Sequence, residues 1–312
     1  MSTPPLLELR NVSKRFVKPL GVFARVGKLL GANVHEEVVH AVDNVSLAIA
    51  PGEVLGLVGE SGCGKSTLGR MAVGLHTLSS GTRLWKGKEI PALDQGGNRS
   101  TLALQMIFQD PYASLNPRMR VQDIIGEAPV AHGIISRDEQ KTYVEELLRQ
   151  VGLNPAVIRH FPHQFSGGQR ARLGIARALA VKPEFLVCDE AVAALDVSIQ
   201  AQILNLFMDL REQLKLTYLF ISHDLAVVRH VSDRIVVMYL GRVVESLPAE
   251  ELFTSANHPY TQALLAEAPK LEVKKKQFVA IKGEIPSPLH PPSGCHFHPR
   301  CPHAMPRCSV EV

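Results

Sequence analysis

The chain has 312 residues, of which 46% are hydrophobic and 21% charged, and its formal net charge is +4. This is an ordinary globular balance with room for a substantial core, and the charge is too small for this length to indicate nucleic-acid binding. No apolar run approaches the roughly 18 residues of a membrane span and no basic-then-apolar leader is evident, so we expect a cytoplasmic protein.

The N-terminal part has the pattern of two half-buried strands. Residues 6–16 and 38–50 alternate apolar and polar positions, as strands with one buried face do. Between them lies a basic, glycine-bearing insert, roughly residues 17–37, that shows no clear period.

The next segment carries a complete phosphate-binding loop pattern, G-x-x-x-x-G-K-[ST]. Residues 54–58 predict a buried strand and residues 68–75 a helix, so the loop lies where the pattern requires it. Its glycines let backbone N–H groups point at phosphate oxygens, and the start of the helix adds a positive dipole end. Lys65 would neutralise the β- and γ-phosphates and Ser66 would hold magnesium, roles that a plain glycine-rich turn would not require. The predicted triphosphate-binding residues are Gly59, Glu60, Ser61, Gly62, Cys63, Gly64, Lys65, Ser66 and Thr67.

The middle of the chain changes from strand to helix signals. Residues 102–109 predict a strand that ends in Gln109, whereas residues 110–165 lack strand signals. Helical stretches such as residues 143–151, stopped by Gly152, occur there instead. We therefore expect a helical subdomain of about residues 110–165 inserted into an α/β core.

From residue 166 onward the α/β alternation resumes. Helices are predicted over residues 168–181 and 198–215, and strands over residues 185–188, 217–221 and, as two short pieces, 233–246. Beyond residue 269 the chain becomes lysine-rich and then proline-rich. We place a domain boundary near residue 270, which separates a domain of residues 1–270 from a C-terminal extension of residues 271–312.

Two polar segments complete a candidate hydrolysis site. Asp189 and Glu190 follow a buried strand, where one carboxylate can organise magnesium and the next can polarise a water molecule. Ser166 can cap a helix on which Gly167 and Gly168 leave bare N–H groups facing outward. Alone, either segment is explained by capping or flexibility, but the phosphate loop favours the functional interpretation of both.

Together these motifs resemble the ATP-binding cassette (ABC) ATPases, in the same order and over roughly residues 6–250. The resemblance implies an α/β fold of the P-loop NTPase kind: a RecA-like core, an antiparallel β subdomain and an inserted helical subdomain. It implies that two domains pair head to tail around two ATP molecules, and that the serine–glycine segment of one contacts the γ-phosphate held by the other. The implied site residues are Lys65, Glu190 and His223 in catalysis, Ser66, Gln109 and Asp189 at magnesium, and Phe16, Ser166, Gly167, Gly168, Gln169 and Asp196 around the nucleotide.

Some of these implied roles are more specific. Gln109 would sense magnesium and couple to the helical subdomain, and Asp196 would lie in the loop that crosses between the two sites. His223 would contact the γ-phosphate and orient the attacking water. Phe16 is the candidate for the aromatic ring that stacks on adenine.

A closer resemblance is to the importer branch that handles oligopeptides, dipeptides and, in some members, nickel, and it rests on residues 108–118, 195–202 and 258–265. The insert, including Gly21, Val22 and Phe23, is similar to that of the second of the two ATPase subunits in such importers. The implied partners are two integral-membrane permease subunits, a second ATPase subunit that is identical or distinct, and indirectly an extracytoplasmic binding protein. The implied location is the cytoplasmic face of the membrane. Ala191 and Ala193 depart from the branch, which usually has proline and serine there, and this leaves the stiffness of the nearby loop open.

The C-terminal end is rich in soft ligands. Cys295, Cys301 and Cys308 have C-x5-C-x6-C spacing, which matches none of the common zinc patterns. Relatives with a similar tail can carry an iron–sulfur cluster held by thiolates. Three cysteines are one short of the usual four, so a metal site and a proline-ordered tail with free thiols remain as alternatives.

Two functions of different classes follow. The first is an ATPase subunit whose ATP-driven closure moves a membrane permease and imports peptides. The alternative is a non-transport ABC ATPase that acts on a ribosome or DNA. Ribosome-acting members typically carry two cassettes and DNA-repair members carry long coiled coils, and this chain shows neither.

Overall fold

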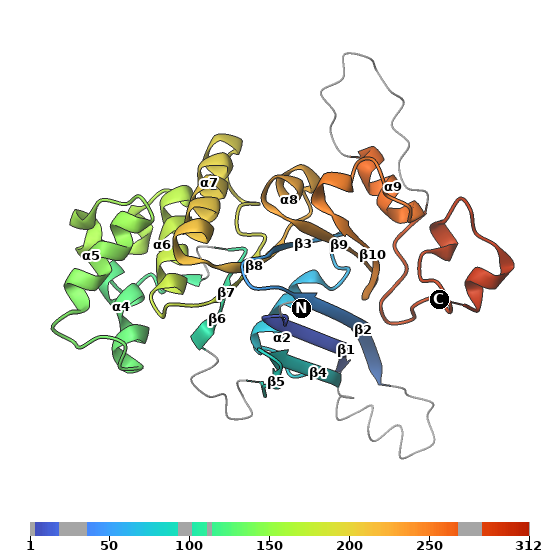
Figure 1. Cartoon of the computed structure of the whole chain (residues 1–312), viewed down its shortest axis with the longest axis horizontal. Helices are drawn as coiled ribbons and strands as arrows, with labels where there is room; N and C mark the ends of the chain where they lie inside the picture. The colour runs from blue at the N-terminus through green and yellow to red at the C-terminus, as the bar shows by residue number, and fades with distance from the viewer. Residues whose placement is uncertain (1–3, 19–35, 93–101, 111–113, 268–282, 312) are drawn as a thin grey trace, which may run out of the picture.

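The computed structural model describes residues 4–18, 36–92, 102–110, 114–267 and 283–311 (Figure 1). The insert residues Gly21, Val22 and Phe23 and the predicted domain boundary near residue 270 lie outside these ranges. The described segments form two sheets with helices packed on them, in agreement with the expected α/β fold.

The main sheet has six strands in the order β10-β9-β3-β8-β7-β6. Only β10 pairs antiparallel; the other neighbours are parallel. Strands β3, β7 and β8 are buried at every residue, as expected for parallel strands covered on both faces. The strands are β3 (Val54–Val58), β6 (Leu104–Ile107), β7 (Phe185–Asp189), β8 (Thr217–Ile221), β9 (Arg234–Tyr239) and β10 (Arg242–Pro248).

The smaller sheet is the antiparallel β subdomain, with the order β2-β1-β4-β5. Helix α2 (Lys65–Val73) lies between the two sheets, in contact with β6, β7 and β8 on one side and with β1 and β2 on the other. Leu55 and Leu57 of β3 belong to the hydrophobic core around α2, whereas Val54 and Val58 belong to the core on the opposite face. The strands are β1 (Leu7–Lys18), β2 (Glu37–Ile49), β4 (Ser80–Trp85) and β5 (Lys88–Glu89).

Helices α4 and α5 form the core of the inserted helical subdomain at one end of the molecule (Figure 1). Helix α5 ends at Gln150, and Gly152 then adopts a φ of +71°, which a glycine tolerates at little cost. Gly152 therefore terminates the helix, as its position in the sequence predicts. The helices of this subdomain and of the core are α4 (Val121–Ala131), α5 (Gln140–Gln150), α6 (Gly167–Leu179), α7 (Val197–Leu214), α8 (Leu225–Val231) and α9 (Pro259–Glu267), with 3₁₀ turns at Pro155–Arg159, Pro162–Gln164 and Ala249–Glu251.

The described part of the C-terminal extension, residues 283–311, lies at the opposite end of the molecule and packs on the core (Figure 1). It contains 3₁₀ turns at His298–Arg300 and Pro306–Ser309. Phe297 is buried, with ring centroids 5.2 Å from Tyr239 and 5.3 Å from Tyr260. Such aromatic clusters stabilise by their buried area and their edge-to-face contacts, so the extension is anchored in the main core. Among the helices of the described residues, none combines the length and apolar character needed to span a membrane.

Candidate functional site

The predicted phosphate loop connects β3 to α2. Gly59 and Gly64 have φ values of +151° and +107°, and a Cβ at either position would lie 2.1 Å from a backbone oxygen, of Met238 and Ala41 respectively. No other residue fits these positions, because a side chain would meet rigid backbone. The glycines of the pattern are therefore required by the local geometry of the loop.

Lys65 lies inside this loop and is 4% exposed. Its Nζ donates hydrogen bonds to the carbonyl oxygens of Gly59, at 2.7 Å, and Glu60, at 2.9 Å. Because the buried ammonium group is hydrogen-bonded to two carbonyl oxygens, it keeps a fixed position. Beside it, burial raises the pKa of the Cys63 thiol, so Cys63 stays neutral and the positive charge of Lys65 is available to an anion.

Ser66 and Asp189 form a pair of oxygen ligands beside the loop. The Ser66 hydroxyl donates to Asp189 Oδ1 at 2.7 Å, which joins the first turn of α2 to the end of β7. Burial raises the pKa of Asp189, opposed by the hydrogen bond from Ser66 and the charge of Arg70. A hydroxyl and a carboxylate are hard oxygen ligands of the kind that magnesium uses together with phosphate oxygens. These two residues therefore fit the predicted magnesium site.

The Glu190 carboxylate contacts two polar side chains. Gln109 Nε2 donates to Glu190 Oε2 at 2.7 Å, and His223 Nδ1 lies 3.5 Å from the same oxygen. Glu190 also has a φ of +47°, a left-handed conformation that is uncommon for a residue with a side chain and that concentrates at functional sites. The structure thus brings together the three side chains that follow strands β6, β7 and β8.

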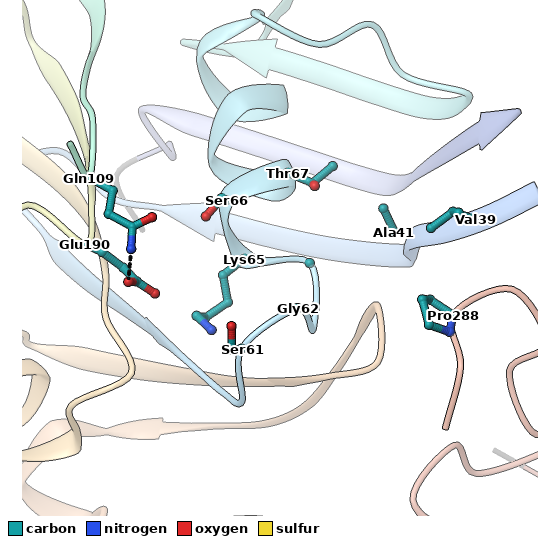
Figure 2. A pocket seen from close by; sticks show the side chains of 11 residues that line it. Val39, Ala41, Ser61, Gly62, Lys65, Ser66, Thr67, Gln109, Glu190 and Pro288 are labelled. Atoms are coloured by element: carbon teal, nitrogen blue, oxygen red, sulfur yellow. Dashed lines mark hydrogen bonds between the residues drawn. The ribbon is translucent and has the colours of Figure 1, made fainter. Parts of the chain in front are cut away.

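Lys65, Ser66, Gln109 and Glu190 line one cavity of about 230 Å³ (Figure 2), whereas Asp189 and His223 lie beside these residues and do not line it. Figure 2 shows Gln109 and Glu190 at one end, Lys65 and Ser61 in the middle, and Val39, Ala41 and Pro288 at the other end. The lining residues are Val39, Ala41, Ser61, Gly62, Gly64, Lys65, Ser66, Thr67, Gln109, Glu190 and Pro288. A polar end and an apolar end joined by a phosphate loop suit a nucleotide, whose phosphates and base have these two characters.

Phe16 is not brought to this cavity. Its ring packs edge-on against His76, with centroids 5.6 Å apart, and Lys14 Nζ lies 5.2 Å from its centroid. Phe16 is 39% exposed and does not line the cavity. Its predicted role at adenine stays a prediction that this geometry does not support.

The serine–glycine segment is also outside the cavity. Ser166 caps α6: its hydroxyl accepts from the Gln169 N–H at 3.4 Å, and the Gln169 side chain accepts from the Ser166 N–H at 3.0 Å. Gly168 has no room for a side chain, because a Cβ would lie 2.5 Å from Ile199 Cγ2. Ser166, Gly167 and Gln169 are exposed, so this helix tip is open to solvent and does not line the cavity of its own chain.

The turn that connects Glu190 to α7 forms without the family's proline and serine. Ala193 N–H donates to the Glu190 carbonyl at 3.0 Å, and Leu195 N–H donates to the Val192 carbonyl at 3.1 Å. Ala191 is buried and Ala193 exposed. Asp196 is the N-cap residue of α7, but its carboxylate makes no capping hydrogen bond to that helix.

The cysteine tail does not form a metal centre in the described residues. Cys295, Cys301 and Cys308 are free thiols, and no group of three or more His, Cys, Asp or Glu side chains in the described chain is arranged to hold a metal ion. The Cys308 Sγ instead accepts from the Met305 N–H at 3.4 Å. The iron–sulfur hypothesis is therefore unsupported by the described residues.

Sequence reasoning missed that this extension contacts the phosphate loop. Arg300 of the extension pairs with the Glu60 carboxylate, and the hydroxyl of Tyr260, on α9, accepts from the Glu60 N–H at 2.8 Å. The pairing with Glu60 raises the pKa of Arg300. No local pattern predicts these contacts, because Arg300 and Glu60 are 240 residues apart in sequence.

Comparison with known proteins gives the same assignment for both parts of the chain. Residues 42–193 match the ABC transporter family and residues 244–308 match the oligopeptide/dipeptide transporter C-terminal region. The oligopeptide transport ATP-binding protein AppF of Bacillus subtilis is 49% identical, with 98% of this chain and 92% of AppF covered. The di/tripeptide transport ATP-binding protein DppF of Pseudomonas aeruginosa is 49% identical, with 88% of this chain and 85% of DppF covered.

A solved structure is similar over most of the fold. It is a dimeric ATP-binding cassette in a post-hydrolysis state bound to ADP and Pi, 26% identical with a TM-score of 0.63, and the match covers 78% of this chain and 98% of that one. The motifs, the cavity that they line and these similarities lead to one conclusion. The chain belongs to the ABC transporter ATPases, in the family of ATP-binding subunits of oligopeptide and dipeptide transporters.

Proposed function

We propose that this chain powers the import of peptides through two membrane permease subunits, at the cytoplasmic face of the membrane and paired with a second ATPase subunit. The peptide cargo and the partners are suggested by relatives that are named as oligopeptide and di/tripeptide transport proteins. The observation that carries the proposal is the convergence of Lys65, Ser66, Gln109 and Glu190 on one cavity whose opposite end is apolar.

In this proposal the triphosphate lies along the loop. The N–H groups of residues 61–66 and the dipole of α2 bind the β- and γ-phosphates, and Lys65 adds its charge. Lys65 then exchanges part of its bonding to the Gly59 and Glu60 carbonyls for phosphate oxygens. Ser66 and Asp189 hold magnesium, with Gln109 beside them, and the bound ion supplies charge neutralisation of the phosphates.

Glu190 is the general base. Its carboxylate is positioned by Gln109 and by His223, each of which contacts Oε2 in the structure. A water held between Glu190 and the γ-phosphate would lose its proton to the carboxylate as its oxygen bonds to the γ-phosphorus, while the bond from that phosphorus to the β–γ bridging oxygen breaks and ADP leaves. His223 orients that water and contacts the γ-phosphate, so hydrolysis depends on both side chains.

The second half of the site comes from a partner. The exposed tip of α6, with Ser166, Gly167 and Gln169, offers helix N-terminal N–H groups to the γ-phosphate held by the other subunit. Asp196 accompanies this tip across the interface. ATP binding therefore closes the pair, and hydrolysis releases it, which drives the permease.

A Glu190→Gln variant tests this function. It should lower ATP hydrolysis by the assembled transporter roughly 100- to 10,000-fold, the usual contribution of a general base, while MgATP binding and ATP-driven pairing persist. Phosphate release and the affinity for MgATP are measured on the same preparation, with Glu89→Gln on the exposed strand β5 as the matched control. Undiminished phosphate release by Glu190→Gln would refute the assignment.

The peptide cargo requires its own measurement. ATP hydrolysis by the transporter, reconstituted with its permease and binding protein, should rise several-fold when the binding protein is loaded with a di- or oligopeptide. Stimulation by no peptide of any length tested would contradict the cargo and leave the ATPase assignment intact.

A further inference from the structure

The C-terminal extension meets the nucleotide site at two separate places. One contact is with the phosphate loop, through Arg300, and the other is with the cavity wall, through Pro288. Neither residue belongs to the ATPase motifs, and both follow the last helix of the core. The extension is therefore joined to the site as well as to the core.

The first contact is a bidentate ion pair. Arg300 Nη1 donates to Glu60 Oε2 at 2.8 Å, and Nη2 donates to Oε1 at 3.0 Å. The side chains are 5% and 19% exposed. Two parallel charge-assisted bonds in a largely buried place fix both the position and the plane of the carboxylate. Arg300 thereby fixes the side chain of the second residue of the phosphate loop.

The same loop residue is also held through its backbone. The Glu60 N–H donates to the Tyr260 hydroxyl at 2.8 Å, and the Glu60 carbonyl accepts from Lys65 Nζ at 2.9 Å. Tyr260 packs on Phe297 of the extension. A continuous series of contacts therefore leads from Arg300 and Phe297 through Glu60 to the Lys65 ammonium, and a displacement of Glu60 would move the ligand of the phosphates.

The second contact is at the apolar end of the cavity. The His40 N–H donates to the Pro288 carbonyl at 3.0 Å, which attaches the extension to β2. The Pro288 ring faces the same space as Val39 and Ala41, at the end opposite Gln109 and Glu190 (Figure 2). With the γ-phosphate at the Glu190 end, the nucleoside would extend toward Pro288, whose ring would offer an apolar surface to it.

We propose that the C-terminal extension is part of the ATP site: Arg300 positions the phosphate loop through Glu60, and Pro288 forms an apolar wall for the nucleoside. The inference rests on the ATP binding of the proposed function and on nothing about cargo or permease. Because linkage is reciprocal, nucleotide binding must also stabilise the docked extension. Arg300 acts through Glu60, so it is a positioning residue.

Binding measurements with two ligands distinguish the role of Arg300 from that of Pro288. MgATP carries phosphates and a nucleoside, whereas magnesium tripolyphosphate carries the phosphates alone. Arg300→Met should raise the Kd of both ligands by about tenfold, within the usual range of coupling between sites. Pro288→Ala should raise the Kd of MgATP about fourfold, the contribution of roughly one buried methylene, and leave the Kd of tripolyphosphate unchanged.

The full-length chain offers matched controls. Arg307 lies in the same extension and is exposed, and the structure records no side-chain ion pair for it among the described residues, so Arg307→Met should leave both affinities unchanged. Arg300→Lys retains the charge without the bidentate geometry and should give intermediate values. Amide hydrogen exchange in residues 283–311 of the wild-type chain should slow when MgATP is added.

Each outcome decides the inference. Equal Kd values for Arg300→Met and Arg307→Met, with both proteins folded, would overturn the role of Arg300. If Arg300→Met does not fold, Arg300→Lys decides, and wild-type affinity in that variant overturns it. Equal losses for both ligands in Pro288→Ala would overturn the nucleoside wall. A wild-type chain that binds no MgATP would instead contradict the proposed function, so the two failures are distinguishable.

Discussion

The phosphate loop and the tip of α6 both present backbone N–H groups at the start of a helix, but their surroundings differ. The phosphate loop is stabilised by contacts within the same chain. The Lys65 ammonium lies inside it, and Tyr260 and Arg300 hold Glu60 in place. The tip is capped by its own Ser166 but is otherwise exposed. Near it, Val197 is an exposed apolar side chain, at 81%.

In the proposed pair of subunits, this difference divides ATP binding and turnover between the two regions. A segment that is completed within one chain can bind its ligand alone, whereas an exposed helix tip needs a ligand brought by another molecule. We therefore expect ATP affinity to depend on the loop and its supports. We expect turnover to depend in addition on the tip.

The largest effect should come from removing the charge at the centre of the loop. Lys65→Met should lower MgATP affinity and turnover roughly 100- to 1,000-fold, as for the loss of one preorganised donor at developing charge. The change also leaves the Gly59 and Glu60 carbonyls without a donor that they have in the wild-type chain. Equilibrium nucleotide binding and phosphate release measure the effect, with the exposed Lys88→Met as control. Unchanged MgATP affinity in Lys65→Met would show that the phosphate loop does not determine ATP binding by the single chain.

A methyl group on the helix tip should affect only the other half. At Gly167 a Cβ would lie 3.5 Å from Leu195 Cδ2, an ordinary contact, so Gly167→Ala should fold. The methyl would intrude where the partner's phosphate approaches, and such a misplacement costs about 100-fold in turnover. MgATP affinity of the isolated subunit should stay within about twofold.

The control for this variant lies in the same helix. A Cβ at Gly174 meets nothing within 4 Å, so Gly174→Ala should change neither turnover nor affinity. If Gly167→Ala lowers the affinity of the isolated subunit as strongly as it lowers turnover, the tip acts within its own chain, and the division between the two regions is wrong.

The sequence predicted the elements of the site better than their surroundings. The strand over residues 54–58 is confirmed as β3, and the strand ending at Cys188 extends one residue to Asp189. The helix over residues 168–181 is confirmed as α6, Gly167–Leu179. These elements are predictable because their apolar runs and caps are local in sequence.

What the sequence did not predict depends on contacts between distant segments. The ring of Phe16 turns to His76, and the Arg300–Glu60 pair joins residues at opposite ends of the chain. Helix α4 contains Pro129, which normally disfavours a helix interior, so it has no clear local signal. The cysteine pattern left a metal site and a tail with free thiols as alternatives, and it gave no sign that packing of Phe297 and pairing of Arg300 fix that segment.

The smallest expected effect is a pH dependence of the free energy of unfolding, caused by a histidine in the C-terminal extension that contacts the phosphate loop. His296 of the extension is buried, with Nδ1 2.9 Å from the Leu240 carbonyl. Burial lowers its pKa, as do Arg242 and His40, while the Leu240 carbonyl and Asp43 oppose this. An unperturbed histidine has a pKa of about 6.5. Below that pH, His296 takes up a proton in the unfolded chain but stays neutral in the folded chain. Stability therefore falls as pH falls from about 6.5 toward the folded pKa.

Replacing the titrating ring should remove this slope. His296→Asn retains an N–H that can donate to the Leu240 carbonyl but cannot gain a charge in this range, so the free energy of unfolding should depend less on pH between 7.5 and 5.5. Denaturant unfolding at several pH values measures it, and His303→Asn, at an exposed position of the same extension, should keep the wild-type slope. A loss of slope in both variants, or in neither, would show that the docked extension does not sense acid through His296. Any pH dependence in the stability of the phosphate loop and its contacts would then come from groups outside the C-terminal extension.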